Sequence, residues 1–189
     1  MKNQNTGTFS RIIQMANPVF ILVAIIAPVG ALLYANIFGP LVSLNYVHIM
    51  AGATWTGIDL FMGFVLGPAM GRMDPRDRVA VFKHLMPRMT FLMPVLAGVT
   101  VTAGIQLAQR LEYSLSTPLF IAAFIITGIL TVQGFGVLLP NEIQIFKELL
   151  SKDPDINKIS RLGMRNAKLG GIQGVMQLII IFIMAAIRI

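Results

Sequence analysis

The sequence predicts an all-α integral membrane protein whose chain crosses the bilayer five times. Of its 189 residues, 56% are apolar, above the roughly 45–50% that is usual in soluble domains. Charged residues make up 12%, about half of the usual share, and mean hydropathy is +0.76. This composition excludes a soluble enzyme, a disordered tail and a fibrous repeat. The length has room for about five spans of about 20 residues, which predicts a single transmembrane domain over residues 1–189.

Five long apolar runs supply the expected spans. The first run contains Pro28, which predicts a kink. No small-residue cleavage signal follows that run, so we expect a retained span rather than a signal peptide. Spans two to five are expected to form a four-helix bundle, with span one packed outside it. The spans cover approximately residues 18–38, 46–68, 87–109, 118–139 and 171–187.

The basic residues predict the orientation of the chain. Two of them, Lys2 and Arg11, precede the first span. Five lie between spans two and three or at the start of span three, and six lie between spans four and five. Only Arg110 and Arg188 fall on the opposite side. Because Lys and Arg gather in cytoplasmic loops, we expect a cytoplasmic N-terminus, an outer C-terminus and a prokaryotic cell membrane. Segment 74–84 is expected to form a short cytoplasmic helix. Segment 141–150 is expected to extend span four beyond the bilayer or to lie along the membrane surface.

Ionisable side chains within a span are costly in hydrocarbon and therefore mark candidate sites. His48 lies in the first turn of span two near the outer surface, and Gly52, Trp55 and Asp59 follow it on the same helical face. An inward-facing histidine beside a glycine has the shape needed for a haem axial ligand, since the flat ring must approach the backbone closely. The alternative is a histidine bonded to a carbonyl or hydroxyl group of a neighbouring helix.

Asp59 lies near the expected midplane of the bilayer, and no Lys or Arg lies at the same depth in any span. We therefore expect a protonated carboxyl or a transient proton or cation site, or else a neutral carboxyl that bridges helices. Gln173 and Gln177, one turn apart, are expected to hydrogen-bond across the bundle. The expected partners of Asp59, chosen by depth, are Thr100, Thr102, Thr131 and Gln133.

Weaker patterns concern glycine, methionine and cysteine. The chain has no cysteine, which excludes disulfides, thiolate metal sites, iron–sulfur clusters and haem attached through C-x-x-C-H. No motif of soluble-enzyme chemistry is present. Three methionines share a helical face that suits Cu(I), although methionine is also common in apolar cores: Met86, Met89 and Met93. Three glycines spaced by four residues favour close helix packing or self-association: Gly63, Gly67 and Gly71.

Four segments resemble, in order, the membrane domain of the urate oxidase N-terminal family, whose members carry a cytochrome c tail. The segments are HIMAGATWTG with FVLGPAM, MPRMTF with AGVTVTAG, LLPNEIQIF, and SRLGMRNAKL, and the resemblance covers about residues 46–189. The His and Trp-x-Gly pattern is also similar to the copper-resistance membrane protein D and membrane protoporphyrinogen oxidase groups. Some relatives of that kind bind haem b through such a histidine, which implies the same role for His48. The chain departs from the family at Asp59, Pro94 and Glu142 and has no cysteine for a haem c, so urate oxidation is not implied.

Taken together, these observations predict a haem b-binding membrane protein that exchanges electrons with a quinone or a partner protein. His48 is the expected iron ligand, and Gly52 and Trp55 are expected to shape the ring pocket. Arg110 is expected to pair with the haem propionates, and Asp59 to act as the catalytic proton site. A methionine or a second protomer would supply a sixth ligand.

Two alternatives to the haem protein stay open. One is a proton, cation or copper transport protein centred on Asp59. The other is a non-catalytic accessory subunit of a respiratory complex. The lipid bilayer is the expected environment, the glycine face is the expected contact of a homo-oligomer, and a nucleic-acid partner is not expected.

Overall fold

The computed structural model describes the backbone of residues 8–114 and 116–187, so Lys2 and Arg188 lie outside the described residues. Within these ranges every regular element is a helix. The elements are α1 (Thr8–Ala16), α2 (Pro18–Ile37), α3 (Leu41–Leu60), η1 (Phe61–Leu66), α4 (Gly67–Gly71), α5 (Pro75–Arg110), α6 (Pro118–Gln133), η2 (Gly134–Leu138), α7 (Leu139–Leu149) and α8 (Ile156–Ile187).

Five helical stretches of the described chain are long and apolar enough to cross a membrane: Pro18–Ile37, Leu41–Gly71, Pro75–Arg110, Pro118–Leu149 and Ile156–Ala186. The all-helical class is therefore confirmed, and five helices have the length and composition expected of spans. Three of these helices begin earlier than the expected spans. The second stretch begins at residue 41, the third at residue 75 and the fifth at residue 156. Helix α5 continues through Pro87 and Pro94, because neighbouring helices can satisfy the backbone groups that a proline frees.

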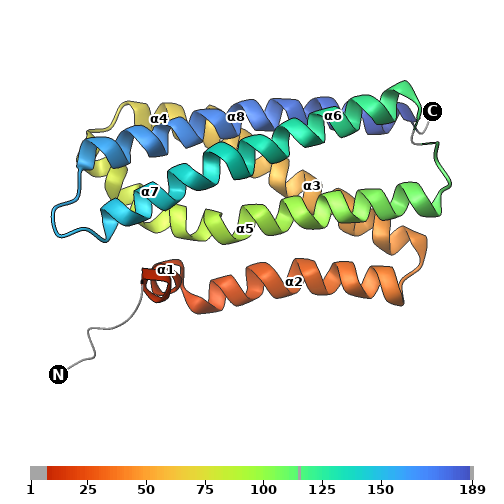
Figure 1. Ribbon diagram of the computed structural model, residues 1–189, viewed down its shortest axis with the longest axis horizontal. Helices are drawn as coiled ribbons and strands as arrows, with labels where there is room; N and C mark the ends of the chain where they lie inside the picture. The colour runs from red at the N-terminus through yellow and green to blue at the C-terminus, as the bar shows by residue number, and fades with distance from the viewer. Residues whose placement is uncertain (1–7, 115, 188–189) are drawn as a thin grey trace.

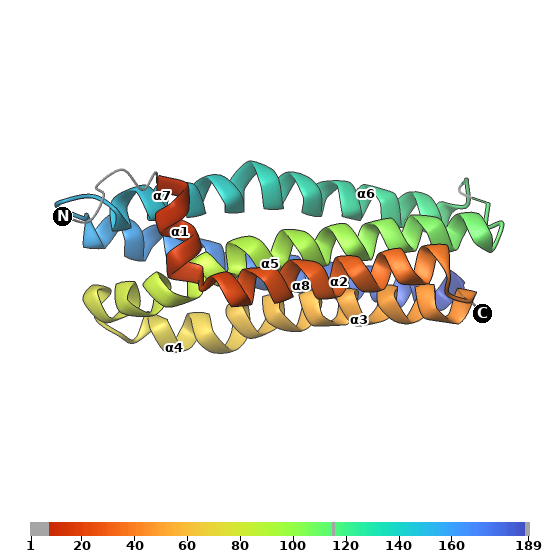
Figure 2. The ribbon, with the colours of Figure 1, turned by 90° about the horizontal axis from the view of Figure 1, so that it is seen from below.

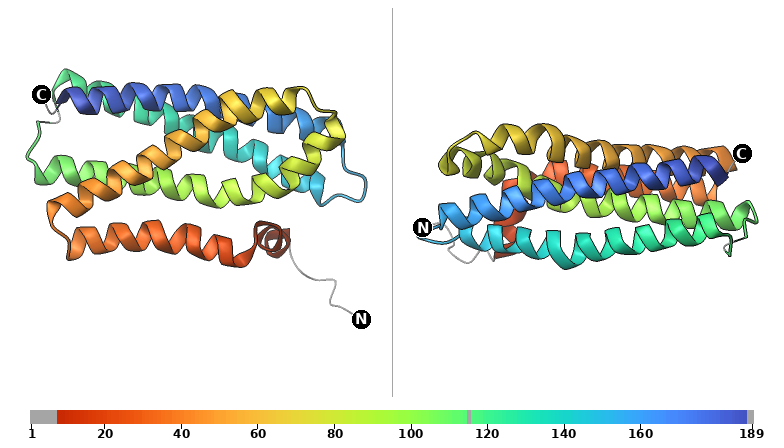
Figure 3. Two further views of the ribbon diagram at one scale, coloured as in Figure 1. Left: turned by 180° about the vertical axis from the view of Figure 1, so that it is seen from behind. Right: turned by 90° about the horizontal axis from the view of Figure 1, so that it is seen from above.

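The four helices of the bundle are α3, α5, α8 and the continuous helix formed by α6, η2 and α7, with α2 outside it (Figures 1 and 2). Helix α2 packs against α5 and α3, while α3 packs against both α5 and α8. Seen from behind, α3 runs obliquely from the side of α2 towards α8 (Figure 3). This arrangement matches the expected bundle with the first span outside.

The connections separate into two groups at opposite ends of the bundle (Figure 1). Helix α1, the turn between α4 and α5, and the connection between α7 and α8 lie at one end. The turn between α2 and α3 and the connection between α5 and α6 lie at the other. The described basic segments that were expected to be cytoplasmic therefore share one end, while Arg110 lies at the opposite one.

Two of the long helices contain π-helical segments in their interiors. Helices α3 and α4 are joined through η1 without a break, and α6 and α7 are joined through η2 in the same way. A π segment shifts the hydrogen-bond register by one residue, and such segments often accompany functional sites. Each segment lies next to a carboxyl side chain: η1 begins two residues after Asp59, and η2 ends four residues before Glu142.

The glycine face of the second stretch packs against α8. A Cβ on Gly63 would lie 2.1 Å from the Cα of Gly171, so the backbones of η1 and α8 touch at this point. A Cβ on Gly67 would lie 3.7 Å from the Cβ of Ala167. The glycines therefore serve close packing within the chain, the first of the two roles expected for them. Self-association through Gly63, Gly67 and Gly71 stays a prediction.

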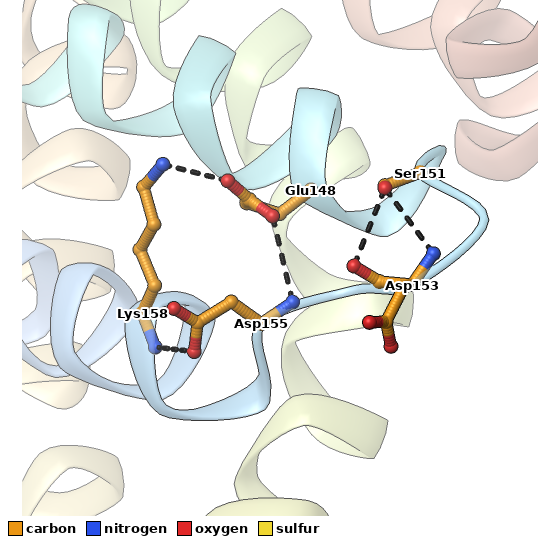
Figure 4. Close-up of polar contacts among 5 residues, drawn as sticks. All are labelled: Glu148, Ser151, Asp153, Asp155 and Lys158. Atoms are coloured by element: carbon orange, nitrogen blue, oxygen red, sulfur yellow. Dashed lines mark hydrogen bonds and ion pairs between the residues drawn. The ribbon is translucent and has the colours of Figure 1, made fainter.

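Polar contacts fix the connection between α7 and α8 (Figure 4). Lys158 Nζ lies 2.6 Å from Glu148 Oε1, and the backbone N–H of Asp155 donates to Glu148 Oε2 at 3.4 Å. Asp155 Oδ1 accepts from the backbone N–H of Lys158 at 2.9 Å and so caps the start of α8. These bonds tie the end of α7 to the start of α8.

Candidate functional site

A cavity of about 310 Å³ lies inside the bundle, between α3 with η1, α5, α8 and the helix that runs from α6 through η2 into α7. This volume is at the lower end of the range typical of small-ligand sites. Most of the walls are apolar and include the expected methionine face, Met86, Met89 and Met93. The polar side chains that line the cavity come from all four helices: Asp59, Thr102, Thr131, Glu142, Asn166 and Gln173.

Asp59 is buried, with 3% of its surface exposed, and two amide groups of α8 hold its carboxyl. Gln173 Nε2 donates to Asp59 Oδ2 at 3.1 Å, and Gln177 Nε2 donates to the same oxygen at 3.0 Å. The expected bonding of these glutamines across the bundle is confirmed. The partners of Asp59 expected by depth were wrong, because α8 rather than α5 or α6 faces this carboxyl.

The close approach of α8 explains how the glutamines reach Asp59. A Cβ on Gly170 would lie 3.3 Å from Asp59 Oδ1, tighter than most contacts of real Cβ atoms. A Cβ on Gly171, the next residue, would lie 2.8 Å from the Cα of Gly63. The Gly170–Gly171 pair therefore brings the α8 backbone against α3 and η1 and places the amide groups beside the carboxyl.

Glu142 supplies a second carboxyl to the same cavity, from α7. Thr90 Oγ1, on α5, lies 2.5 Å from Glu142 Oε2 and 2.9 Å from the backbone carbonyl oxygen of Met86. A threonine hydroxyl has one proton and can donate it to only one of these two oxygens. When it donates to the carbonyl, as helical threonines often do, a protonated Glu142 can supply the donor for the short contact.

An asparagine pair lies beside the cavity, and one of its members, Asn166, lines it. Asn141 Nδ2 donates to Asn166 Oδ1 at 2.7 Å, and Asn166 Nδ2 donates to the backbone carbonyl oxygen of Leu138 at 3.1 Å. Leu138 is the last residue of η2, so Asn166 satisfies a carbonyl group at the end of a π segment. Gln133 makes a related bond, since its Nε2 donates to the carbonyl oxygen of Leu169 at 2.8 Å. These amides tie the helix of η2 to α8.

The ionisable side chains that line the cavity are all acidic. Two carboxyl groups line it, and none of its described lining residues is Lys, Arg or His. The salt bridge found among the described residues, Lys158–Glu148, lies outside it. The arrangement can bind a proton or a cation, because an uncompensated carboxylate in a low-dielectric site attracts positive charge strongly.

His48 lies outside this cavity, against α5. Its Nδ1 is 2.8 Å from the backbone carbonyl oxygen of Thr100, and a Cβ on Gly104 would lie 2.8 Å from the ring. This hydrogen bond is the alternative expected for a histidine at a helix contact. Gly52 meets the same helix, since a Cβ there would lie 3.2 Å from Thr100 Cγ2.

The structure thus divides the residues of the expected haem site. His48 and Gly52 face α5, whereas Trp55 and Asp59 line the cavity. Arg110 lies at the end of the bundle opposite the basic segments (Figure 1), and its Nη2 donates to Asn36, at 2.6 Å to the backbone carbonyl oxygen and 3.0 Å to Oδ1. Within the described part of the chain, no group of three or more His, Cys, Asp or Glu side chains is arranged to hold a metal ion.

Sequence reasoning missed Glu142 as a site residue, because it lies in the segment expected to extend beyond the bilayer. The available signal was its place directly after Pro140 and Asn141, in the same helix as an apolar run. It also missed the pairing of Asn141 with Asn166. Comparison with family models, curated proteins and solved structures gave no match. The resemblance to the urate oxidase N-terminal family therefore stays a prediction.

Proposed function

We propose that the protein transports a proton or another cation across a membrane and that Asp59 is the group that binds it. One observation carries the proposal: two carboxyl groups from different helices line one cavity, and no basic side chain lines it among the described residues. Ionisable residues inside a membrane bundle commonly mark proton or ion pathways. The haem protein expected first from the sequence has less support, because its residues do not gather around one space.

The proposal places the chain in a prokaryotic cell membrane with a cytoplasmic N-terminus. The described basic segments at one end of the bundle support this orientation (Figure 1). Glu142 then lies nearer the cytoplasm than Asp59. The neighbour of Glu142, Asn141, bonds to Asn166, whereas Asp59 bonds to Gln173, farther along α8. The two carboxyl groups therefore mark successive depths.

The surrounding groups suit a carboxyl that exchanges its charge. The amide donors of Gln173 and Gln177 stabilise an ionised Asp59, while burial in apolar surroundings favours the neutral form. Thr90 gives Glu142 a partner in either state, because its hydroxyl can donate or accept. A π segment lies near each carboxyl. Because the hydrogen-bond register of a helix can shift at such a segment, the helix on each side of the cavity can change its conformation there.

Proton entry into liposomes tests the proposal. The purified protein is reconstituted around a pH-sensitive dye, an inside-negative potential is imposed, and the rate of internal acidification is measured. We expect a protein-dependent rate that falls at least tenfold in Asp59→Asn. Glu112→Gln, which alters an exposed carboxyl between α5 and α6, is the matched control and keeps the wild-type rate. A rate equal to that of empty liposomes, or one unchanged in Asp59→Asn, contradicts transport of the proton through Asp59.

A second candidate function, haem b binding in electron transfer with a quinone or partner protein, is favoured by one observation. The bond between His48 Nδ1 and the Thr100 carbonyl oxygen leaves Nε2 as the ring nitrogen available to iron. The fit to a haem is incomplete, since His48 lines neither the main cavity nor a second one of about 200 Å³ between α2, α3 and α5.

A visible spectrum of the protein in mild detergent distinguishes the candidate functions. A Soret band that is lost in His48→Ala supports haem binding. A colourless protein that gives no proton flux would support the third hypothesis, a non-catalytic accessory subunit of a respiratory complex.

A further inference from the structure

The hydrogen-bonding groups around Asp59 include more acceptors than donors. Gln173 is 4% exposed and uses its Nε2 to bond Asp59, while its Oε1 is buried without a partner. The Oε1 of Gln177 is also buried without a partner. A buried acceptor without a donor is costly, because the group has lost its hydrogen bonds to water. A ligand that complements this site therefore brings N–H or O–H donors as well as positive charge.

The rest of the cavity is suited to a hydrocarbon body. Apart from six polar side chains, its walls are formed by methionine, aliphatic and aromatic residues, among them Trp55 and Phe135. Methionine side chains adapt to irregular ligands, and an aromatic face adds attraction for a cation. The cavity therefore combines a carboxyl group at one place with apolar walls elsewhere, which is the chemistry of an amphipathic cation.

The exposed lining residues indicate that the cavity opens between α5 and the helix formed by α6 and η2. Lining residues on both sides of this opening are exposed on the bundle surface: Gly98, Thr102, Thr131 and Phe135. Helix α6 packs against α8, whereas α5 packs against α3, α2 and α8 and meets the neighbouring continuous helix at α7, so α5 and α6 stand apart (Figure 1). All four residues lie within stretches long and apolar enough to span the bilayer. The opening therefore faces the hydrocarbon of the membrane.

We infer that the cavity binds a lipophilic primary amine, which enters from the bilayer between α5 and α6 and is held as its ammonium ion against Asp59 and Gln173. The inference rests on the proposed function and names its substrate class. The neutral amine crosses the hydrocarbon, and the carboxyl proton of Asp59 passes to the amine nitrogen. The products are an ammonium ion and a carboxylate that pair with each other, while the N–H groups reach the acceptor oxygen of Gln173.

Fluorescence of Trp55 tests the ligand class, because this residue is the only tryptophan of the chain and it lines the cavity. The full-length protein in lipid nanodiscs is titrated with 1-aminoadamantane, 1-adamantanol and trimethyl-1-adamantylammonium. The three probes share one rigid cage and differ only in the polar group. We expect a saturable change with the amine and at least tenfold weaker binding of the alcohol and of the quaternary ion. Equal binding of all three, or no change with any, overturns the inference.

Variants connect the binding to the carboxyl and to the opening. Asp59→Asn should weaken binding of the amine at least tenfold, while Glu112→Gln should bind as the wild type does. Gly98→Phe, at the opening, should also weaken binding at least tenfold. Gly128→Phe is its control: a Cβ at either glycine meets nothing within 4 Å, but Gly128 does not line the cavity. Far-ultraviolet circular dichroism checks that each variant keeps its helices.

The two proposals fail in different ways. Proton entry that depends on Asp59, together with absence of amine-selective binding, overturns the substrate class and leaves the transport proposal standing. Amine-selective binding that is lost in Asp59→Asn, without any proton entry, supports the binding site and contradicts transport of the proton. Wild-type binding by Gly98→Phe overturns the route between α5 and α6.

Discussion

The contact between η1 and α8 positions the carboxyl site, and Gly63→Ala tests it. The new Cβ would lie 2.1 Å from the Cα of Gly171, whereas ordinary contacts begin near 3.4 Å, so the two backbones must separate by about 1.3 Å. Overpacking of this kind costs about 1–3 kcal/mol. We expect a packing cost near the upper end of this range, because both contacting segments are backbone and cannot move aside easily. The preference of helices for alanine over glycine, about 1 kcal/mol, offsets part of this cost.

Alanine substitutions at two further glycines should rank in destabilisation according to how closely the new Cβ approaches its neighbour. Gly171→Ala brings its Cβ 2.8 Å from the Cα of Gly63 and should destabilise less than Gly63→Ala. Gly57→Ala is the matched control on α3, since its Cβ meets nothing within 4 Å, and it should be neutral or stabilising. The assay is unfolding in mixed micelles, followed by helical circular dichroism. Wild-type stability of Gly63→Ala, or a larger loss in Gly57→Ala, refutes the packing argument.

Two other predictions concern the asparagine pair and the orientation. Asn141→Leu or Asn166→Leu should each cost about 1–3 kcal/mol of unfolding free energy, because the remaining amide loses its partner, and the double variant should cost less than the sum. Additive costs in the same assay would contradict the direct bond. Since the chain has no cysteine, Ser151→Cys should react with an impermeant maleimide only from the cytoplasmic side and Ser114→Cys only from outside. The reverse pattern contradicts the orientation.

The sequence predicts the number of long apolar helices well, because about twenty apolar residues in succession have few other structures. It predicts the ends of those helices less well. Pro87 begins the expected third span, whereas helix α5 runs through it from Pro75, since tertiary packing overrides the local preference of proline. The expected extension of span four is found in α7, which ends at Leu149.

The candidate site, like the helices, could be predicted from the sequence only in part. Helical periodicity correctly placed His48, Gly52, Trp55 and Asp59 along α3, but a periodicity has no information about which neighbouring helix meets each residue. The oblique course of α3 brings its first part against α5 and its later part against α8, so the expected stripe serves two different contacts (Figure 3). The role of Glu142 depends on the course of α7 beside α5, which no local pattern reports.

Labelling by a hydrophobic carbodiimide probes the carboxyl-lined cavity itself, because this reagent reaches carboxyl groups from the lipid phase and reacts with their protonated form. We predict modification of Asp59 and Glu142 in membranes, located by peptide mass spectrometry and slowed by 1-aminoadamantane. Glu112, which is exposed in the connection between α5 and α6, should stay unmodified. Absence of modification at both cavity carboxyls, in a protein that keeps its helical circular dichroism, would contradict a carboxyl-lined cavity that opens to the bilayer.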